Sequence, residues 1–159
     1  MTLNTPEQWM AHALLEAKKA LMHNEIPVGA VIVKDNKLIG HGFNQVIMGT
    51  DPSAHAEVVA LRKAAENQQN YRLLNSDIYV TLEPCMMCLG AMIHARIRKL
   101  FFATNQPKTG IICSKGSLHK MDFLNHRLVV EGNILADQAS SILKNFFKKK
   151  RMTKNNNNY

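Results

Sequence analysis

The segment DIYVTLEPCMMCLGAMIHARIRKLFFAT, residues 77–104, places a helical pattern between two short apolar runs. It predicts strands at 77–82 and 99–104, with a helix at 85–96 that connects them. A helical crossover of this kind lets the two strands pair in parallel. The segment therefore predicts that the chain has an α/β architecture.

The remaining patterns extend this sheet on both sides. The first helix begins with a capping box, in which Thr5 is the N-cap, Pro6 stands at N1 and Gln8 at N3. We expect a five-stranded mixed sheet with helices on both faces. The other expected elements are helices at 6–24, 54–67 and 134–151 and strands at 28–33, 38–44 and 127–132.

Length and composition are those of one globular domain. We expect the domain to span residues 1–152 of the 159, with a disordered, basic and Asn-rich tail at 153–159. No apolar run approaches the roughly 20 residues that cross a bilayer, and the N-terminus lacks the pattern of a secretory signal. Three cysteines do not form a disulfide framework. We therefore expect a cytoplasmic protein that is not inserted in a membrane.

The positive charge is concentrated at the C-terminus. The net charge is +8, but the first 143 residues contribute only +2, and six basic and no acidic residues follow from Lys144 onward. Such a segment is either a solvated helix face or a surface that contacts the phosphates of a nucleic acid. Charge alone does not decide between the two.

Cys85 and Cys88 stand three residues apart at the start of a predicted helix, directly after Pro84. This spacing puts both sulfurs on one helix face, where the helix dipole lowers the pKa of a thiol. Three interpretations are open: a buried pair, a redox pair, or half of a zinc site. Cys113 cannot supply a second C-x-x-C pair, and we predict that it is not a zinc ligand.

The third ligand is then expected to be a histidine, and His55 differs from the other six because of its neighbours. It begins a helix in SAHAEVV, two residues before Glu57. One His and two Cys leave a fourth position open, which is typical of a catalytic zinc site. H-x-E followed by P-C-x-x-C is the signature of zinc-dependent nucleobase deaminases, in which the Glu transfers protons and is not a ligand. Here 26 residues separate the two halves of the motif.

Further segments of the chain accompany this motif: PVGAV (27–31), DPSAHAE (51–57), NYRL (70–73), YVTLEPCMMCLGAMIHARI (79–97), NHR (125–127) and FFKKKR (146–151). Through them the chain, from about Trp9 to Arg151, resembles the bacterial tRNA-specific adenosine deaminases of the cytidine deaminase-like superfamily. The resemblance implies a three-layer α/β/α fold, a homodimer, one Zn²⁺ per subunit and deamination of adenosine to inosine at the wobble position of a tRNA anticodon, chiefly of the tRNA-Arg type. The zinc motif alone also fits a deaminase of a free base or nucleotide, such as guanine or cytosine, which is the alternative.

The same resemblance implies roles for further residues. Asn44 would contact the target nucleoside, Val28 would line its pocket, and a peptide N–H near Leu82 or Glu83 would hold the base. Gln106 stands where the family commonly has an Asp that contacts a ribose. For Phe146 and Phe147, packing in the core and stacking on a base remain open alternatives. The positions expected to contact the anticodon stem-loop are Gln106, Lys108, Phe146, Phe147, Lys149 and Arg151.

Overall fold

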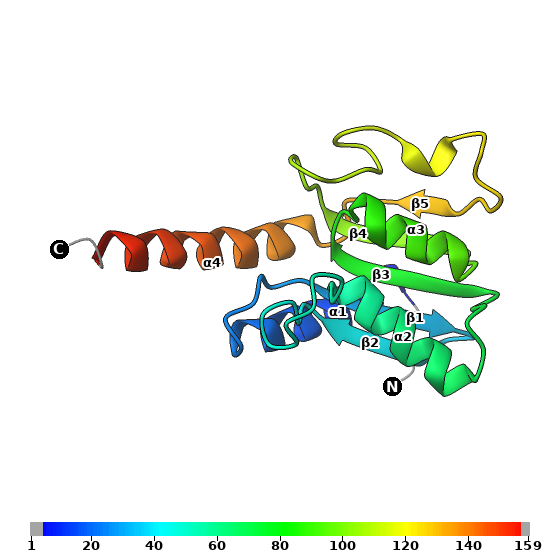
Figure 1. The fold of residues 1–159 in the computed structure, drawn as a ribbon, viewed down its shortest axis with the longest axis horizontal. Coiled ribbons are helices and arrows are strands. Elements are labelled where there is room, and N and C mark those ends of the chain that lie inside the picture. The colour runs from blue at the N-terminus through cyan, green and yellow to red at the C-terminus, as the bar shows by residue number, and fades with distance from the viewer. Residues whose placement is uncertain (1–4, 157–159) are drawn as a thin grey trace.

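The computed structural model describes residues 5–156 and contains one five-stranded sheet (Figure 1). The strand order is β2-β1-β3-β4-β5. β1 is antiparallel to β2 and β3, whereas β4 is parallel to β3 and β5. The predicted mixed sheet and the parallel pairing of the two strands in the segment 77–104 are confirmed. The strands are β1 (Gly29–Lys34), β2 (Lys37–Phe43), β3 (Ser76–Leu82), β4 (Lys99–Thr104) and β5 (Val129–Glu131).

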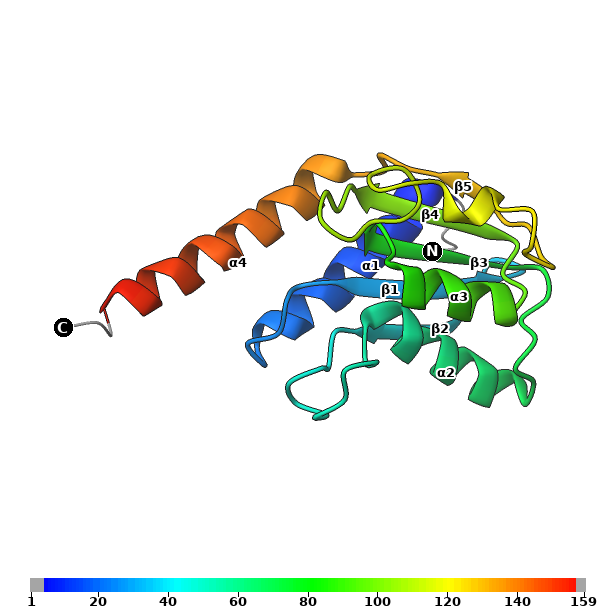
Figure 2. The ribbon, with the colours of Figure 1, turned by 45° about the horizontal axis from the view of Figure 1, so that its top comes forward.

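Helices cover both faces of this sheet, as predicted. α2 and α3 lie on one face, and α1 lies on the other, together with the start of α4 (Figure 2). The rest of α4 extends beyond the sheet as a single helix. None of the helices within residues 5–156 is long and apolar enough to cross a membrane. The helices are α1 (Pro6–Leu21), α2 (Ala56–Gln68), α3 (Met86–His94), α4 (Ala136–Asn156) and the 3-10 helix η1 (Leu118–Lys120).

The three central strands bury side chains on both faces. In β1, Ala30 and Ile32 belong to the core cluster formed with α2 and α3, whereas Val31 and Val33 belong to the cluster formed with α1. The side chains of β3 and β4 alternate in the same way. This burial explains the continuous apolar runs in the sequence, because strands that are covered on both faces do not alternate with polar residues.

On β2, Gly40 allows α2 to pack directly against the strand. A Cβ at this position would lie 2.5 Å from the carbonyl oxygen of Ala60, so only a glycine permits the approach. The close contact fixes α2, and with it the side chains at its N-terminus, relative to the sheet.

Several expected boundaries are corrected by the structure, and α1, for example, ends at Leu21 and not at residue 24. α4 continues to Asn156, so residues 153–156, which we expected in a disordered tail, are helical. The last three residues of the expected tail, 157–159, lie outside the described part. β5 is shorter than predicted and covers only Val129–Glu131. The predicted capping box of α1 is confirmed, with Thr5 and Gln8 bonded to each other's backbone N–H groups.

Candidate active site

The topology gathers several chain segments at one end of the sheet. β1 begins there, and β2, β3 and β4 end there, because β1 runs antiparallel to β2 and β3 while β3 and β4 are parallel. The helices α2 and α3 also begin at this end, with His55 and Cys85 as their N-cap residues. Residues distant in the sequence thus meet at the carboxyl ends of β3 and β4, where open α/β sheets commonly bind ligands.

His55, Cys85 and Cys88 form a group with the dimensions of a zinc site. The Nδ1 atom of His55 lies 3.7 Å from the Sγ atom of Cys85 and 3.5 Å from that of Cys88, and the two Sγ atoms are 3.7 Å apart. Tetrahedral zinc with ordinary bond lengths would require about 3.6 Å between nitrogen and sulfur and about 3.8 Å between the sulfurs. The donor set fits zinc in geometry and in chemistry. Within residues 5–156 this is the one group of three or more potential metal ligands, and Cys113 is not part of it.

The environment of the thiols favours a thiolate. The hydrogen bond with Cys88, and a further one with His55, lower the pKa of Cys85 to about 4 although burial opposes this shift. The same shared hydrogen bond and burial raise the pKa of Cys88. One thiolate is therefore stabilised by the protein itself, and thiolates are the form of cysteine that binds metals.

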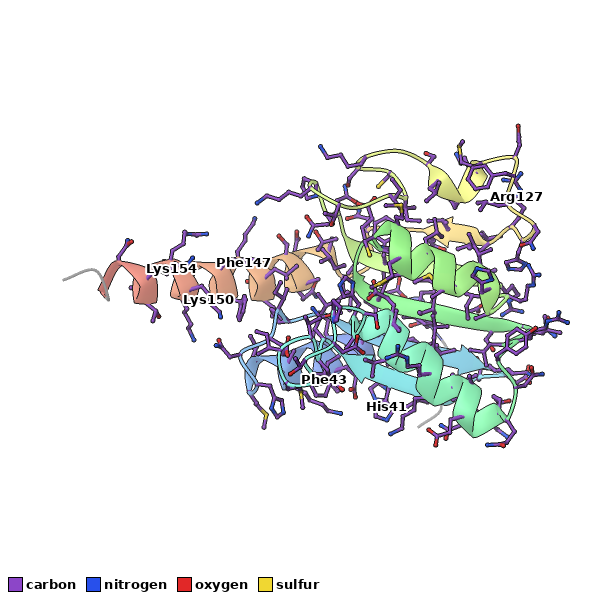
Figure 3. The ribbon with its side chains drawn as sticks, viewed as in Figure 1. His41, Phe43, Arg127, Phe147, Lys150 and Lys154 are labelled. Atoms are coloured by element: carbon purple, nitrogen blue, oxygen red, sulfur yellow. The ribbon has the colours of Figure 1, made fainter. Side chains whose placement is uncertain are left out.

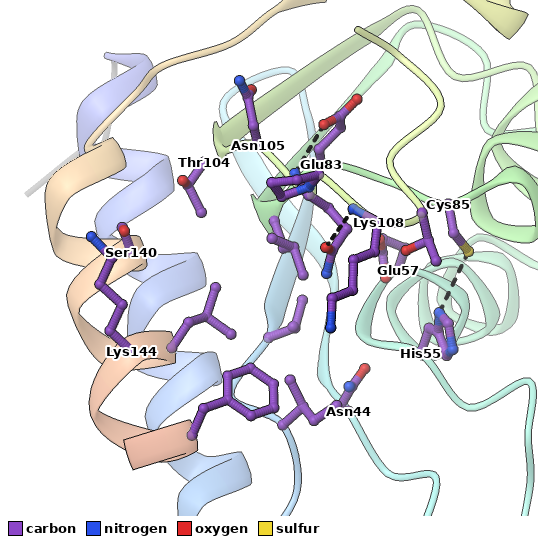
Figure 4. Close-up of a pocket in the computed structure, with 18 of the residues that line it drawn as sticks. Asn44, His55, Glu57, Glu83, Cys85, Thr104, Asn105, Lys108, Ser140 and Lys144 are labelled. Carbon is purple, nitrogen blue, oxygen red and sulfur yellow. Dashed lines mark hydrogen bonds between the residues drawn. The ribbon is translucent and has the colours of Figure 1, made fainter. Parts of the chain in front are cut away.

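Glu57 lies in the first turn of α2, two residues from His55, with 4% of its surface exposed. Burial raises the pKa of its carboxyl to about 7. A carboxyl group whose pKa lies near neutrality is suited to accept and return a proton. Glu57 lines the same cavity as His55 and Cys85, so it is placed for proton transfer beside the candidate metal centre (Figure 4).

The cavity has a volume of about 780 Å³ and contains most of the predicted site residues. Three predicted residues do not line it: Cys88 is buried beneath it, Phe146 is only 9% exposed, and Lys149 lies on the exposed surface of α4. Phe147, in contrast, is 41% exposed and lines the cavity. The predicted residues that line it are Val28, Asn44, His55, Glu57, Leu82, Glu83, Cys85, Gln106, Lys108, Phe147 and Arg151.

In two of these residues, Asn44 and Glu83, a polar group already forms a hydrogen bond within the protein. The Oδ1 atom of Asn44 accepts a hydrogen bond from the N–H of Ala56 at 3.0 Å, so the NH₂ end of the amide is the end left to donate to a ligand. The peptide N–H of Glu83 donates to the carbonyl oxygen of Thr104 at 2.8 Å. Because this N–H already has an acceptor, the peptide group of Leu82 is the better candidate of the two to hold the base.

Sequence reasoning found only part of the side of the cavity that α4 forms: it predicted Phe147 and Arg151 and missed Ser140, Leu143 and Lys144. Ser140, Leu143 and Lys144 lie on the same side of α4 as Phe147 and Arg151, and Figure 4 shows Ser140 and Lys144 across the cavity from His55. Counted from Ser140, the other four residues follow at three, four, seven and eleven positions, which is the spacing of a single helix face. This spacing was the signal in the sequence that could have identified them. The other lining residues that we did not predict are Ile26, Thr104, Asn105, Pro107 and Thr109.

Comparisons with known proteins agree with this geometry. A family model described as the cytidine and deoxycytidylate deaminase zinc-binding region matches residues 3–104. The tRNA-specific adenosine deaminase of Haemophilus influenzae is 50% identical over 149 residues, which cover 93% of this chain and 86% of that protein.

Solved structures share the fold. A structure from work on A-to-I editing by tRNA:A34 deaminases at the wobble position of transfer RNA has a TM-score of 0.83 and 36% identity, and the match covers 85% of this chain and 98% of that one. A guanine deaminase from Bacillus subtilis is 41% identical with a TM-score of 0.61, over 65% of this chain and 66% of that one. The His-Cys-Cys group, the matched zinc-binding region and the extent of the identity together show that this chain belongs to the zinc-dependent cytidine deaminase family and, within it, to the tRNA-specific adenosine deaminases.

Proposed function

We propose that this protein converts adenosine to inosine at the wobble position of a tRNA anticodon, by hydrolysis. The observation that carries the proposal is the cavity itself, which has the candidate zinc ligands at its base and the basic helix α4 along one side. Deamination of a free base would need only the zinc ligands. Deamination of a nucleotide within an RNA loop would also use the basic helix α4.

The residues at the base of the cavity have distinct roles in this proposal. Zinc, when bound by His55, Cys85 and Cys88, lowers the pKa of a water molecule and so supplies the nucleophile. Glu57 would accept one proton from the attacking water and deliver it to a ring nitrogen as the C–O bond forms. It would then take the remaining proton of the added hydroxyl and pass it to the amino group, which leaves as ammonia while the C=O bond forms. Its burial is important, because a carboxyl with an ordinary pKa near 4 would be a weak acid–base catalyst at neutral pH.

The walls of the cavity would orient the base. Val28 and Leu82 offer apolar surface, and the Asn44 NH₂ group offers a hydrogen-bond donor to the nucleoside. Phe147 is the exposed ring available for stacking on a base, whereas the burial of Phe146 supports a structural role in anchoring α4.

α4 would contact the phosphates of the anticodon stem-loop. It carries Lys144, Lys148, Lys149, Lys150, Arg151 and Lys154, and its single carboxylate, Asp137, stands in its first turn. Figure 3 shows Lys150 and Lys154 on the part of the helix that extends beyond the sheet. A row of cations on a protruding helix suits a polyanion that extends past the cavity. Gln106 and Lys108, which line the cavity from the loop after β4, would contact the RNA as well.

We also propose that two copies form a homodimer and that the protein acts in the cytoplasm. Met86 and Met87 are exposed at the start of α3, beside Cys85, and apolar side chains in that position are suited to contact a second copy. Light scattering should give about twice the mass of one chain, and a monomer would contradict the dimer. Cell fractionation tests the location.

A direct assay separates this function from the alternative deamination of free bases. The purified protein is incubated with an anticodon stem-loop that has adenosine at the wobble position, and separately with adenosine, guanine and cytosine, and released ammonia is measured. We expect release from the stem-loop. Release from guanine or cytosine alone would assign the protein to the free-base deaminases, which the similarity to a guanine deaminase makes the second candidate.

A further inference from the structure

Glu83 lies between the end of β3 and the Pro84-Cys85 segment, and its carboxylate is enclosed by a distant loop. Only 2% of the residue is exposed. Its Oε1 atom accepts hydrogen bonds from the backbone N–H groups of Ile112, Cys113 and Ser114 at 3.1, 2.8 and 2.9 Å. Its Oε2 atom accepts one from the N–H of Gln106 at 2.9 Å and another from the Ser114 hydroxyl. The carboxylate therefore has five donors, all from residues 106–114.

The loop is shaped around this carboxylate. Gly110 has no side chain at the point where a Cβ would overlap the carboxylate of Glu83. The N–H of Ile111 also donates to the carbonyl oxygen of Pro84 at 3.1 Å, which ties the loop to the residue before Cys85. Five donors to a single carboxylate favour its ionised form. The group is a buried anion whose charge is balanced by backbone donors.

The same loop forms one wall of the cavity. Residues 105–109 line it, and Gln106 is both a lining residue and a donor to Glu83. We propose that Glu83, although it lines the cavity, acts as a positioning residue: its carboxylate is occupied by residues 106–114, so that it fixes the wall formed by residues 105–109 and thereby sets the affinity for RNA. This inference rests on the proposed function, because it assigns the wall to RNA recognition.

The two oxygens of Glu83 have different partners, so an amide tests them separately. In Glu83→Gln the remaining oxygen can keep the three N–H groups of residues 112–114, and the new NH₂ group can donate to the Ser114 hydroxyl. The new NH₂ group then also faces the N–H of Gln106, and two hydrogen-bond donors cannot form a hydrogen bond with each other. The substitution should therefore release the Gln106 end of the loop and retain the other end.

The test combines kinetics on the anticodon stem-loop with amide hydrogen exchange of the zinc-loaded protein. For Glu83→Gln we expect a KM that rises about tenfold, because a charge-assisted hydrogen bond to the wall is lost, with kcat changed less than about twofold. Exchange at the Gln106 amide should become faster, while the amides of Cys113 and Ser114 stay protected. Zinc content should remain that of the wild type.

Asp77→Asn is the matched control, since it also replaces a carboxylate by an amide, and Asp77 lies at the start of β3 whereas Glu83 directly follows the end of this strand. Asp77 binds Arg98 at 2.8 and 2.9 Å and does not line the cavity. The Asp77→Asn substitution should reduce the free energy of unfolding and leave the KM for the stem-loop unchanged.

An unchanged KM in Glu83→Gln, or unchanged exchange at Gln106, would overturn the proposal. An equal fall in kcat and zinc content would also overturn it, because Glu83 would then support the metal site and not the wall. Hydrogen exchange does not depend on the substrate. If the wild type fails to act on the stem-loop, the proposed function fails while the exchange result still reports on the positioning role.

Discussion

Replacing Glu57 by glutamine tests the assignment of the proton-transfer group. The amide has nearly the same shape as the carboxyl, so it leaves no cavity in a residue that is 4% exposed. It cannot accept and return the proton. General acid–base catalysis contributes about 10²–10⁴-fold to a rate, which corresponds to roughly 3–5 kcal/mol of the barrier. We therefore expect kcat for the stem-loop to fall at least about 100-fold.

The assay measures three quantities for Glu57→Gln and for the wild type: inosine formed in single turnovers, zinc per chain, and the midpoint of urea unfolding. Glu57 is not among the three grouped ligand residues, so zinc content should stay at about one per chain. Cys85→Ser is the matched control, because it removes a ligand and should lose both zinc and activity.

Two results would refute the reasoning about Glu57. If the variant keeps more than about a tenth of the wild-type kcat, another group carries the proton. If it loses zinc together with activity, then Glu57 acts on the metal site, and the fall in rate says nothing about proton transfer.

Four further substitutions test the metal site and the helix α4. Cys113→Ser should retain about one zinc per chain by metal analysis, because Cys113 lies outside the ligand group; loss of zinc would contradict this. Phe146→Ala should lower the free energy of unfolding by about 3 kcal/mol in urea titrations, since the ring is buried. Phe147→Ala should instead weaken stem-loop binding and leave the free energy of unfolding nearly unchanged. If Phe147→Ala lowers stability and Phe146→Ala weakens binding, then Phe146 contacts the RNA and Phe147 anchors α4. Lys149→Ala should reduce the slope of log affinity against log salt concentration by about 1; an unchanged slope would remove Lys149 from the phosphate contacts.

The metal centre was predictable because its chemistry requires particular residue types at particular spacings. Cys85 and Cys88 begin a helix, and His55 stands two residues before the acid–base Glu57. Sequence spacing alone did not show that the two halves meet. Their contact depends on the placement of β1 between β2 and β3, which brings the starts of α2 and α3 to one end of the sheet.

The role of the Glu83 side chain was not predictable in this way. Its partners lie 23 to 31 residues further along the chain, in a loop without regular secondary structure. Hydrophobic periodicity, which predicted the strands and helices, carries no signal in such a segment. The extension of α4 to Asn156 was missed for a different reason: the Asn-rich composition favours disorder, but adding residues to an existing helix is easier than starting one.

Sequencing of cellular tRNAs tests the central claim most directly. A strain that lacks its own wobble adenosine deaminase is supplied with this protein, with the Glu57→Gln variant, or with neither, and inosine at the anticodon wobble position is read as guanosine after reverse transcription. We predict inosine in tRNA-Arg only with the wild-type protein. Wobble adenosine that remains unmodified in the presence of folded, zinc-loaded wild-type protein would contradict the account.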